Sequence, residues 1–502
     1  MNEKKWYFLL LFIFPVFFIL HGINENYGLI PAKVLFALLL KYSFVTAIIS
    51  SISWLLFKTP QKFLLFSFIV LAVYFFFGAA KDFFEDIIPA LSFRYKYLIP
   101  IIILGIVLLY LLLKKLNLKG KRIGFYLCTL LIVLVAFDAV LLLVNILRHS
   151  EKEIDMGDSN QQLIENHKPH VLANKPTVFW IVFDEYPSSI SLKKGWDYNN
   201  PIDSLLRQRG FYVADSAKSN YNFTHYSLTS TLDMVYLNRL RNHSIVTIRD
   251  LVRGNKSLAK NNVTSLFESQ GYSIQNYSIY NLDKYPSKGI LSFKRTPRSL
   301  IDHQTLDSRI KKDIGWNFIN LFKKDKKSAD SAHYLQINRE IDSGYNLLIS
   351  NSQAAFREQA LKQIPSFFMI HVLLPHEPFI YKQDGTFSAF TAGDSNKEAF
   401  LEQLKYTNRV IENITDSILS IYAKKEIAII IQGDHGFKFA ETDPLFEQES
   451  CGILYAVYNS QRKYSSLYPS ISAVNGFRIL FNDYFDTRFP LLPDSSFNLY
   501  YR

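Results

Sequence analysis

The chain has 502 residues, 56 Lys and Arg against 44 Asp and Glu for a formal net charge of +12, and two cysteines. That length exceeds what one hydrophobic core usually holds, so at least two structural units are expected. The basic excess lies in short loops and scattered lysines rather than in one stripe, which argues against nucleic-acid binding, and Cys128 and Cys451 cannot supply a disulfide framework.

Residues 1–147 are predicted to form a transmembrane domain of about five helices. Charges are sparse there, and the apolar runs approach the length of about 17–25 residues that a spanning helix needs. The first run follows two lysines, as in a signal peptide, but no small-residue cleavage site follows it. The five runs are Trp6–Leu20, Val34–Phe57, Phe63–Phe77, Tyr97–Leu113 and Ile123–Leu147.

Basic residues predict how these helices are oriented. They precede the first run and fill the loops after the second and fourth runs, whereas the other loops are neutral or mixed. Because basic loops face the cytoplasm, an odd number of spans places everything after Leu147 outside it. We therefore expect a multi-pass protein of the cell (inner) membrane, with a polar juxtamembrane linker at 148–176 and an extracytoplasmic domain at 177–502.

The C-terminal half has the pattern of an α/β domain with a central, mostly parallel sheet. Short continuous apolar runs are typical of strands buried on both faces, and helix-like stretches lie between them. The predicted strands are Val178–Phe183, Phe367–Leu374 and Ile427–Gln432, and the predicted helices include Ile202–Arg209, Val263–Gly271 and Lys397–Tyr422.

Polar residues follow each predicted strand. Since catalytic groups in such sheets gather beyond the carboxyl ends of the strands, these residues are expected to converge. Carboxylates and imidazoles are ligands of a divalent ion of the zinc or manganese type. The residues are Asp184 and Glu185 after the first strand, His371 and His376 at the second, and Asp434 and His435 after the third.

Four motifs carry a resemblance to a known family. They are Ile-Val-Phe-Asp184-Glu185, Asn222-Phe-Thr224-His-Tyr-Ser227-Leu, Pro375-His376-Glu-Pro378-Phe and Gly433-Asp434-His435-Gly436. In this order, from about residue 177 to 480, the chain resembles the alkaline phosphatase superfamily. Within it, the chain is similar to membrane-anchored sulfatase-domain proteins related to lipoteichoic acid synthases and phosphoethanolamine transferases.

This resemblance implies one divalent ion, Zn or Mn, held by an acid, the nucleophile and an Asp-His pair. The implied ligands are Asp184, Thr224, Asp434 and His435, with Glu185 as an alternative to Asp184. A threonine hydroxyl on such an ion can attack phosphorus, so Thr224 is the expected nucleophile and Ser227 the alternative.

The remaining motif residues have less specific expected roles. His376 is expected to bind substrate or to act as an acid or base. His371 is either a buried core histidine or a further ligand. A helix starting near Tyr226 is expected to point its amides at a bound phosphate.

The sequence departs from the wider superfamily in two respects. No Cys/Ser-x-Pro-x-Arg signature surrounds either cysteine, which argues against sulfate-ester hydrolysis through formylglycine. No histidine follows His435, so one ion rather than two is expected.

The leading hypothesis is a transferase that moves phosphoglycerol or phosphoethanolamine from a membrane phospholipid donor to a glycan or lipid acceptor in the cell envelope. The alternatives are a phosphodiesterase or other hydrolase of the same fold, and a non-catalytic, membrane-tethered binding protein.

Overall fold

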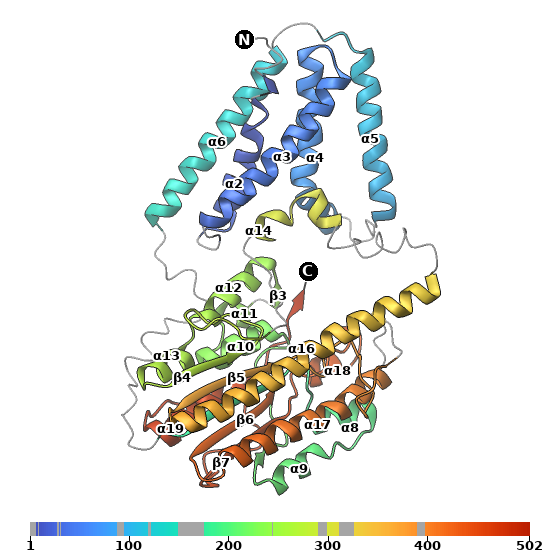
Figure 1. The fold of residues 1–502 in the computed structure, drawn as a ribbon. Helices are drawn as coiled ribbons and strands as arrows, with labels where there is room; N and C mark the ends of the chain where they lie inside the picture. The colour runs from blue at the N-terminus through green and yellow to red at the C-terminus, as the bar shows by residue number, and fades with distance from the viewer. Residues whose placement is uncertain are drawn as a thin grey trace. The chain divides into compact units, whose positions relative to one another are not determined.

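The chain forms two compact units in the computed structural model (Figure 1). The structure describes residues 7–501 except 9, 28–29, 31, 88–94, 119–121, 149–174, 243, 290–298, 311–325 and 389–396. Unit 1 comprises Met1–Ile154 and Arg295–Lys326, and unit 2 comprises Asp155–Lys294 and Lys327–Arg502. The sequence predicted a membrane domain at 1–147 and a separate C-terminal domain at 177–502. In the structure, residues 299–310 of the C-terminal half group with the N-terminal helices. Most of the predicted linker, residues 149–174, lies outside the described residues.

Unit 1 is a helical membrane unit. Its helices are α2 (Ile13–Glu25), α3 (Ala32–Leu56), α4 (Pro60–Ile87), α5 (Tyr95–Lys115), α6 (Arg122–Arg148) and the short α14 (Ser299–Asp302). Among the described residues, α3 to α6 contain four segments long and apolar enough to cross a membrane, while α2 is a shorter apolar helix. The prediction of a multi-span domain is therefore confirmed, with four full-length spans and a shorter first helix.

Large apolar side chains on these helices point away from the protein. Leu55 is 85% exposed and Leu147 is 76% exposed. Such surface is costly in water and favourable in lipid, and continuous helices satisfy their own backbone polar groups. The chain is therefore an integral membrane protein.

Unit 2 is built on a six-stranded mixed sheet in the order β2-β7-β6-β1-β5-β4. Strands β4, β5, β1 and β6 are parallel, and β7 and β2 add antiparallel pairs at one edge. The three strands predicted from sequence are the adjacent β5, β1 and β6. The strand bounds are β1 Thr177–Phe183, β2 Tyr212–Val213, β4 Ser273–Tyr277, β5 Ser366–Val372, β6 Ile427–Gly433 and β7 Tyr455–Asn459, while β3 (Ile245–Val246) pairs separately with β8 (Tyr500–Tyr501).

Helices cover both faces of this sheet. Phe179 of β1 packs against Phe356 of α16 and against Tyr422, just beyond α17, whereas its neighbour Trp180 packs against Phe477 of α19. Alternate side chains of a strand point to opposite faces, so a continuous apolar strand needs cover on both sides. The helices are α8 (Ser189–Trp196), α9 (Ile202–Gln208), α10 (Thr224–Asp233), α11 (Asn238–Asn242), α12 (Ile248–Ala259), α13 (Asn262–Ser269), α16 (Lys326–Lys362), α17 (Lys397–Ile421), α18 (Leu445–Glu449) and α19 (Ala473–Phe485).

The carboxyl ends of the three central strands are held together by backbone hydrogen bonds. The Asp184 N–H donates to the Val372 carbonyl at 3.0 Å, and the Asp434 N–H donates to the Phe183 carbonyl at 3.1 Å. The parallel ladder therefore continues one residue past the strands. This extension fixes the first acid after β1 next to the first acid after β6.

Candidate active site

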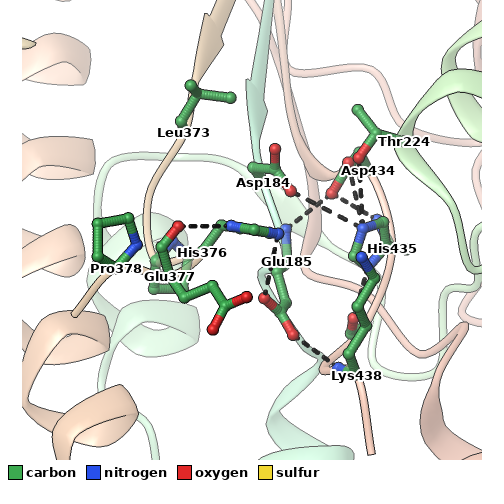
Figure 2. A network of polar contacts seen from close by, with 12 residues as sticks. Asp184, Glu185, Thr224, Leu373, His376, Glu377, Pro378, Asp434, His435 and Lys438 are labelled. Atoms are coloured by element: carbon green, nitrogen blue, oxygen red, sulfur yellow. Dashed lines mark hydrogen bonds and ion pairs between the residues drawn. The ribbon is translucent and has the colours of Figure 1, made fainter. Parts of the chain in front are cut away.

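Three side chains from two strand ends form a compact, buried cluster (Figure 2). Asp184, Asp434 and His435 each offer one ligand atom, and these atoms lie within 4.8 Å of one another. Asp184 follows β1, and Asp434 and His435 follow β6. Two buried carboxylates and an imidazole at this spacing form a candidate metal site.

Hydrogen bonds orient the cluster toward its centre. Oδ1 of Asp434 accepts from the backbone N–H of Glu185 at 2.8 Å and of His435 at 2.7 Å. The His435 Nδ1–H donates to the Gly436 carbonyl at 2.7 Å, which leaves Nε2 facing Asp184 Oδ1 at 3.8 Å and Asp434 Oδ2 at 3.6 Å. A backbone bond of this kind at the other ring nitrogen is typical of metal-ligating histidines.

Two carboxylate oxygens at the centre have no hydrogen-bond partner among the described residues. They are Asp184 Oδ1 and Asp434 Oδ2, both buried. An unpaired buried carboxylate oxygen is costly, and a divalent cation would compensate both oxygens at once. The donor set of two carboxylates, one imidazole and a nearby hydroxyl suits zinc or manganese.

The charges of the cluster shift its acids in opposite directions. Burial opposes ionisation of Asp184, but the nearby histidines, above all His376, outweigh it and lower the pKa of Asp184. Burial, reinforced by the charge of Asp184, raises the pKa of Asp434. The two carboxylates repel each other without a cation, as expected for buried acids that share a site.

Thr224 faces this cluster from the first residue of α10. Its Oγ1 lies 3.4 Å from His435 Nε2. Ser227, one turn further on, is fully buried and donates its hydroxyl to the Asp434 carbonyl. The structure thus brings Thr224 to the candidate metal site, whereas Ser227 supports the backbone of the turn that carries Asp434.

Glu185 and His376 form a second pair beside the cluster. Glu185 has a positive φ of 61°, and its carboxylate accepts from the Lys438 N–H at 2.7 Å. His376 Nε2 lies 3.9 Å from Glu185 Oε2, while His376 Nδ1–H donates to the Glu377 carbonyl at 2.7 Å. Of the two adjacent acids, Asp184 joins Asp434 and His435, and Glu185 faces His376.

The environment of this pair favours a protonated His376. Burial opposes its charge, but Asp184 and Glu185 outweigh that effect and raise the pKa of His376. Burial raises the pKa of Glu185, against the effect of His376. The His376 side chain retains 25% exposure, so its proton can reach a ligand or solvent.

His371 lies near the second carboxylate oxygen of Asp184, whereas His435 lies near the first. The His371 Nε2 is 3.8 Å from Asp184 Oδ2, and its ring stacks on Tyr280 with centroids 6.3 Å apart. Burial lowers the pKa of His371, so the neutral imidazole is favoured. Neither ring nitrogen has a hydrogen-bond partner among the described residues.

Two further residues at the site were not predicted. Tyr280 stacks on His371, and burial next to Asp184 and Asp434 raises its pKa. Lys438 places an exposed ammonium near the Phe223 ring, 5.4 Å from its centroid. Lys438 follows the Gly-Asp-His-Gly motif by two residues and could have been suggested by that position, whereas no sequence signal marks Tyr280.

The mostly parallel sheet and the acids and histidines at its strand ends define an α/β protein with a candidate metal site. Comparison with known proteins identifies its family. A family model described as Sulfatase matches residues 176–477, more than half of the chain. The chain therefore belongs to the sulfatase family of enzymes. No curated relative matches it in sequence.

Several solved structures resemble the chain. The C-terminal periplasmic domain of EcEptC from Escherichia coli in complex with Zn is 13% identical, with a TM-score of 0.39, over 65% of this chain and 90% of that chain. The integral membrane protein lipooligosaccharide phosphoethanolamine transferase A from Neisseria meningitidis is 11% identical, with a TM-score of 0.38, over 94% of this chain and 93% of that chain.

Proposed function

We propose that the protein is a metal-dependent phosphotransferase that takes a phosphoryl head group from a membrane phospholipid. The observation that carries this proposal is the position of Thr224. Its hydroxyl lies at a helix N-terminus, 3.4 Å from His435 Nε2, and so borders the cluster with Asp184 and Asp434. A nucleophile beside a set of metal-ligating side chains is the arrangement that activates a weak hydroxyl.

Asp184, Asp434, His435 and Thr224 would hold one divalent ion. When bound, that ion lowers the pKa of a coordinated hydroxyl and neutralises charge on phosphoryl oxygens. Thr224 Oγ, with its proton released to solvent, would form a bond to phosphorus as the bond from phosphorus to the lipid's glycerol oxygen breaks. The N-terminal amides of α10 and the Lys438 ammonium favour the phosphoryl oxygens electrostatically.

His376 is the proposed acid for the leaving group. With its Nδ1–H engaged by the Glu377 carbonyl, Nε2 carries the transferable proton of the protonated ring. That proton passes to the departing alkoxide, and Glu185 stabilises the cationic ring beforehand. In the second half-reaction the acceptor hydroxyl attacks phosphorus, His376 takes its proton, and the Thr224 oxygen leaves.

The membrane unit fits a lipid donor. The basic residues of the loops after the second and fourth predicted spans place those loops in the cytoplasm, which puts unit 2 outside it. The sequence motifs suggest phosphoglycerol or phosphoethanolamine as the group and a glycan or lipid of the envelope as acceptor. A hydrolase of the same fold would use the same residues with water as acceptor, and turnover with and without a glycan acceptor separates the two.

The metal site is tested by replacing Asp434 and His435 together with Ala in the full-length protein. We expect loss of bound metal and of phosphodiester turnover, because two of the three clustered ligands are removed. The exposed Asp197→Ala is the matched control and should leave both unchanged. Full metal content in the double variant would contradict the proposed site.

A further inference from the structure

A cavity of about 50 Å³ lies within unit 1, on the side of α2 that carries His21 and Glu25. Its walls come from α2, from α4 and from residues 299–310, and all three segments belong to unit 1. A single bound water needs about 10–15 Å³ of such space. The cavity therefore has room for a small chemical group.

The cavity is shaped by the packing of these three segments. A Cβ on Gly22 of α2 would come within 2.8 Å of Ile301 Cγ1, so α14 lies directly against α2. Helix α4 departs from helical geometry at Phe76 (φ −109°, ψ 17°), and the Gly78 N–H donates to the Gln304 carbonyl at 2.8 Å. Kinks in helices have identifiable causes, and here an external carbonyl accepts the N–H next to the kink.

His21 lies between two carboxylates. Its Nδ1 is 3.3 Å from Oδ2 of Asp138, a buried acid of α6, and its Nε2 is 3.7 Å from Glu25 Oε1. The Asn24 side-chain amide donates to Asp138 Oδ1 at 3.2 Å and to the Asp138 carbonyl at 2.7 Å, which holds this acid in place. Because a carboxylate only accepts, a neutral His21 ring bonds to Asp138 with its proton on Nδ1, and Nε2 is then an acceptor that faces Glu25. A donor placed between Nε2 and Glu25 would bond to both.

The cavity wall is rich in acceptors and aromatic surface. Glu25 supplies a carboxylate, and Gln304 has a buried amide oxygen, Oε1, with no hydrogen-bond partner among the described residues. No Lys or Arg stands among the described residues that line the cavity. The rings of Phe18 and Phe76 also line it and pack edge to face, with centroids 5.6 Å apart. Acceptors, negative charge and aromatic rings are the features that recognise an ammonium group.

The cavity lies in the outward half of the membrane unit. Glu25 is the last residue of α2 and Ala79 lies in the second half of α4, and basic residues place the start of both helices on the cytoplasmic side. Glu25 and Ala79 are exposed, so the cavity is open to the surface of the unit. The helices around it expose apolar side chains to lipid, such as Phe83 at 60% and Phe137 at 61%. A ligand would therefore enter from the outer leaflet.

We propose that this cavity binds the primary ammonium head group of an outer-leaflet lipid, of the phosphatidylethanolamine type. Such a head group brings three N–H donors, for which Glu25, His21 Nε2 and Gln304 Oε1 are acceptors. A choline head group has the charge but no N–H donor, and a glycerol head group has no positive charge. The site belongs to the membrane unit alone and does not depend on the reaction proposed for unit 2.

Native mass spectrometry of the full-length protein in detergent, titrated with lipid, tests this proposal. Phosphatidylethanolamine, phosphatidylcholine and phosphatidylglycerol of equal chain length are compared, with free ethanolamine as a competitor. Glu25→Gln removes the charge and keeps the size of the side chain, and Ala79→Leu fills the cavity from an exposed position. The matched controls are the exposed Glu426→Gln and Ala80→Leu, which changes the exposed neighbour of Ala79 outside the cavity lining.

Phosphatidylethanolamine should bind about fivefold or more tightly than phosphatidylglycerol, with phosphatidylcholine between them. Glu25→Gln and Ala79→Leu should each reduce this preference to about twofold or less, and both controls should retain it. Equal binding of phosphatidylethanolamine and phosphatidylglycerol, or an undiminished preference in either variant, would overturn the proposal. Displacement of the lipid by millimolar free ethanolamine would overturn the assignment to a lipid. Binding is measured without turnover, so failure of the proposed function would leave this result unaffected.

Discussion

Asp434 uses its two oxygens for different purposes. Oδ1 accepts two backbone N–H groups, which fixes the side chain, while the buried Oδ2 has no hydrogen-bond partner among the described residues. Burial and the charge of Asp184 raise the pKa of Asp434. In the metal-free protein this ionised carboxylate therefore opposes folding, although it is needed to hold a cation.

A stability measurement tests whether the ionised Asp434 carboxylate destabilises the metal-free protein. We expect metal-free Asp434→Asn to melt at a higher temperature than the metal-free unaltered protein at neutral pH, because Asn keeps the acceptor and removes the charge. A folded pKa raised above the unfolded value gives stability that is present at low pH and lost as pH rises through the folded pKa. The advantage of Asp434→Asn should therefore appear as pH rises above about 4, the unfolded Asp value.

Thermal melts in detergent with excess chelator, taken across that pH range, supply the measurement. With zinc added, the order should reverse, since only the unaltered protein gains from binding the ion. If metal-free Asp434→Asn were less stable than the unaltered protein at every pH, the ionised Asp434 carboxylate would not destabilise the metal-free fold.

At the scale of elements, the turn after β6 packs its backbone directly against the backbone of two other segments. A Cβ on Gly433 would lie 2.3 Å from the Tyr186 carbonyl oxygen, and one on Gly436 would lie 2.4 Å from the Glu449 carbonyl oxygen. Neither glycine has a positive φ. Close approach, rather than backbone conformation, therefore requires glycine on both sides of Asp434 and His435.

Gly433→Ala should accordingly destabilise the protein and displace the turn. Overpacking of this kind costs about 1–3 kcal/mol, and the shift should also weaken metal binding. Gly105→Ala in α5 is the matched control, because its Cβ would meet nothing within 4 Å and should be tolerated. Melting temperature and metal content measured side by side provide the check, and equal effects of the two substitutions would contradict the packing argument.

The central strands could be predicted because they are continuous apolar runs. Strand β4, with the sequence Ser-Ile-Gln-Asn-Tyr, could not, since its buried Gln275 and Asn276 break the apolar pattern. Asn276 is satisfied by the Tyr280 and Tyr285 carbonyls, which are contacts that only the fold creates. Tertiary hydrogen bonds thus override the local signal there.

The candidate site was accessible from sequence because its side chains follow strand ends. Which of Asp184 and Glu185 joins the cluster could not be settled from sequence. It depends on the left-handed backbone of Glu185, which turns the second acid toward His376. The place of residues 299–310 in unit 1 could not be predicted either. Helix α14 has only four residues, and the segment is placed by tertiary contacts such as those with Lys41 and Gly78.

At the scale of the whole molecule, the orientation of the membrane helices decides whether unit 2 can reach envelope substrates. We expect activity from a reporter enzyme that works only outside the cytoplasm when it is fused after Arg502, because the strongly basic loops face the cytoplasm. A reporter that works only in the cytoplasm should be silent at the same position. The reverse pattern would overturn the proposed location of the catalytic unit.

The central claim is that Thr224 carries the phosphoryl group, and intact mass followed by peptide mass tests it most directly. Full-length protein incubated with phosphatidylethanolamine or phosphatidylglycerol should gain the mass of one phosphoryl head group, located on Thr224. Thr224→Ala should lose the adduct and nearly all turnover, Thr224→Ser should keep part of both, and Ser227→Ala should be milder than Thr224→Ala. An adduct that persists in Thr224→Ala and disappears in Ser227→Ala would contradict the account.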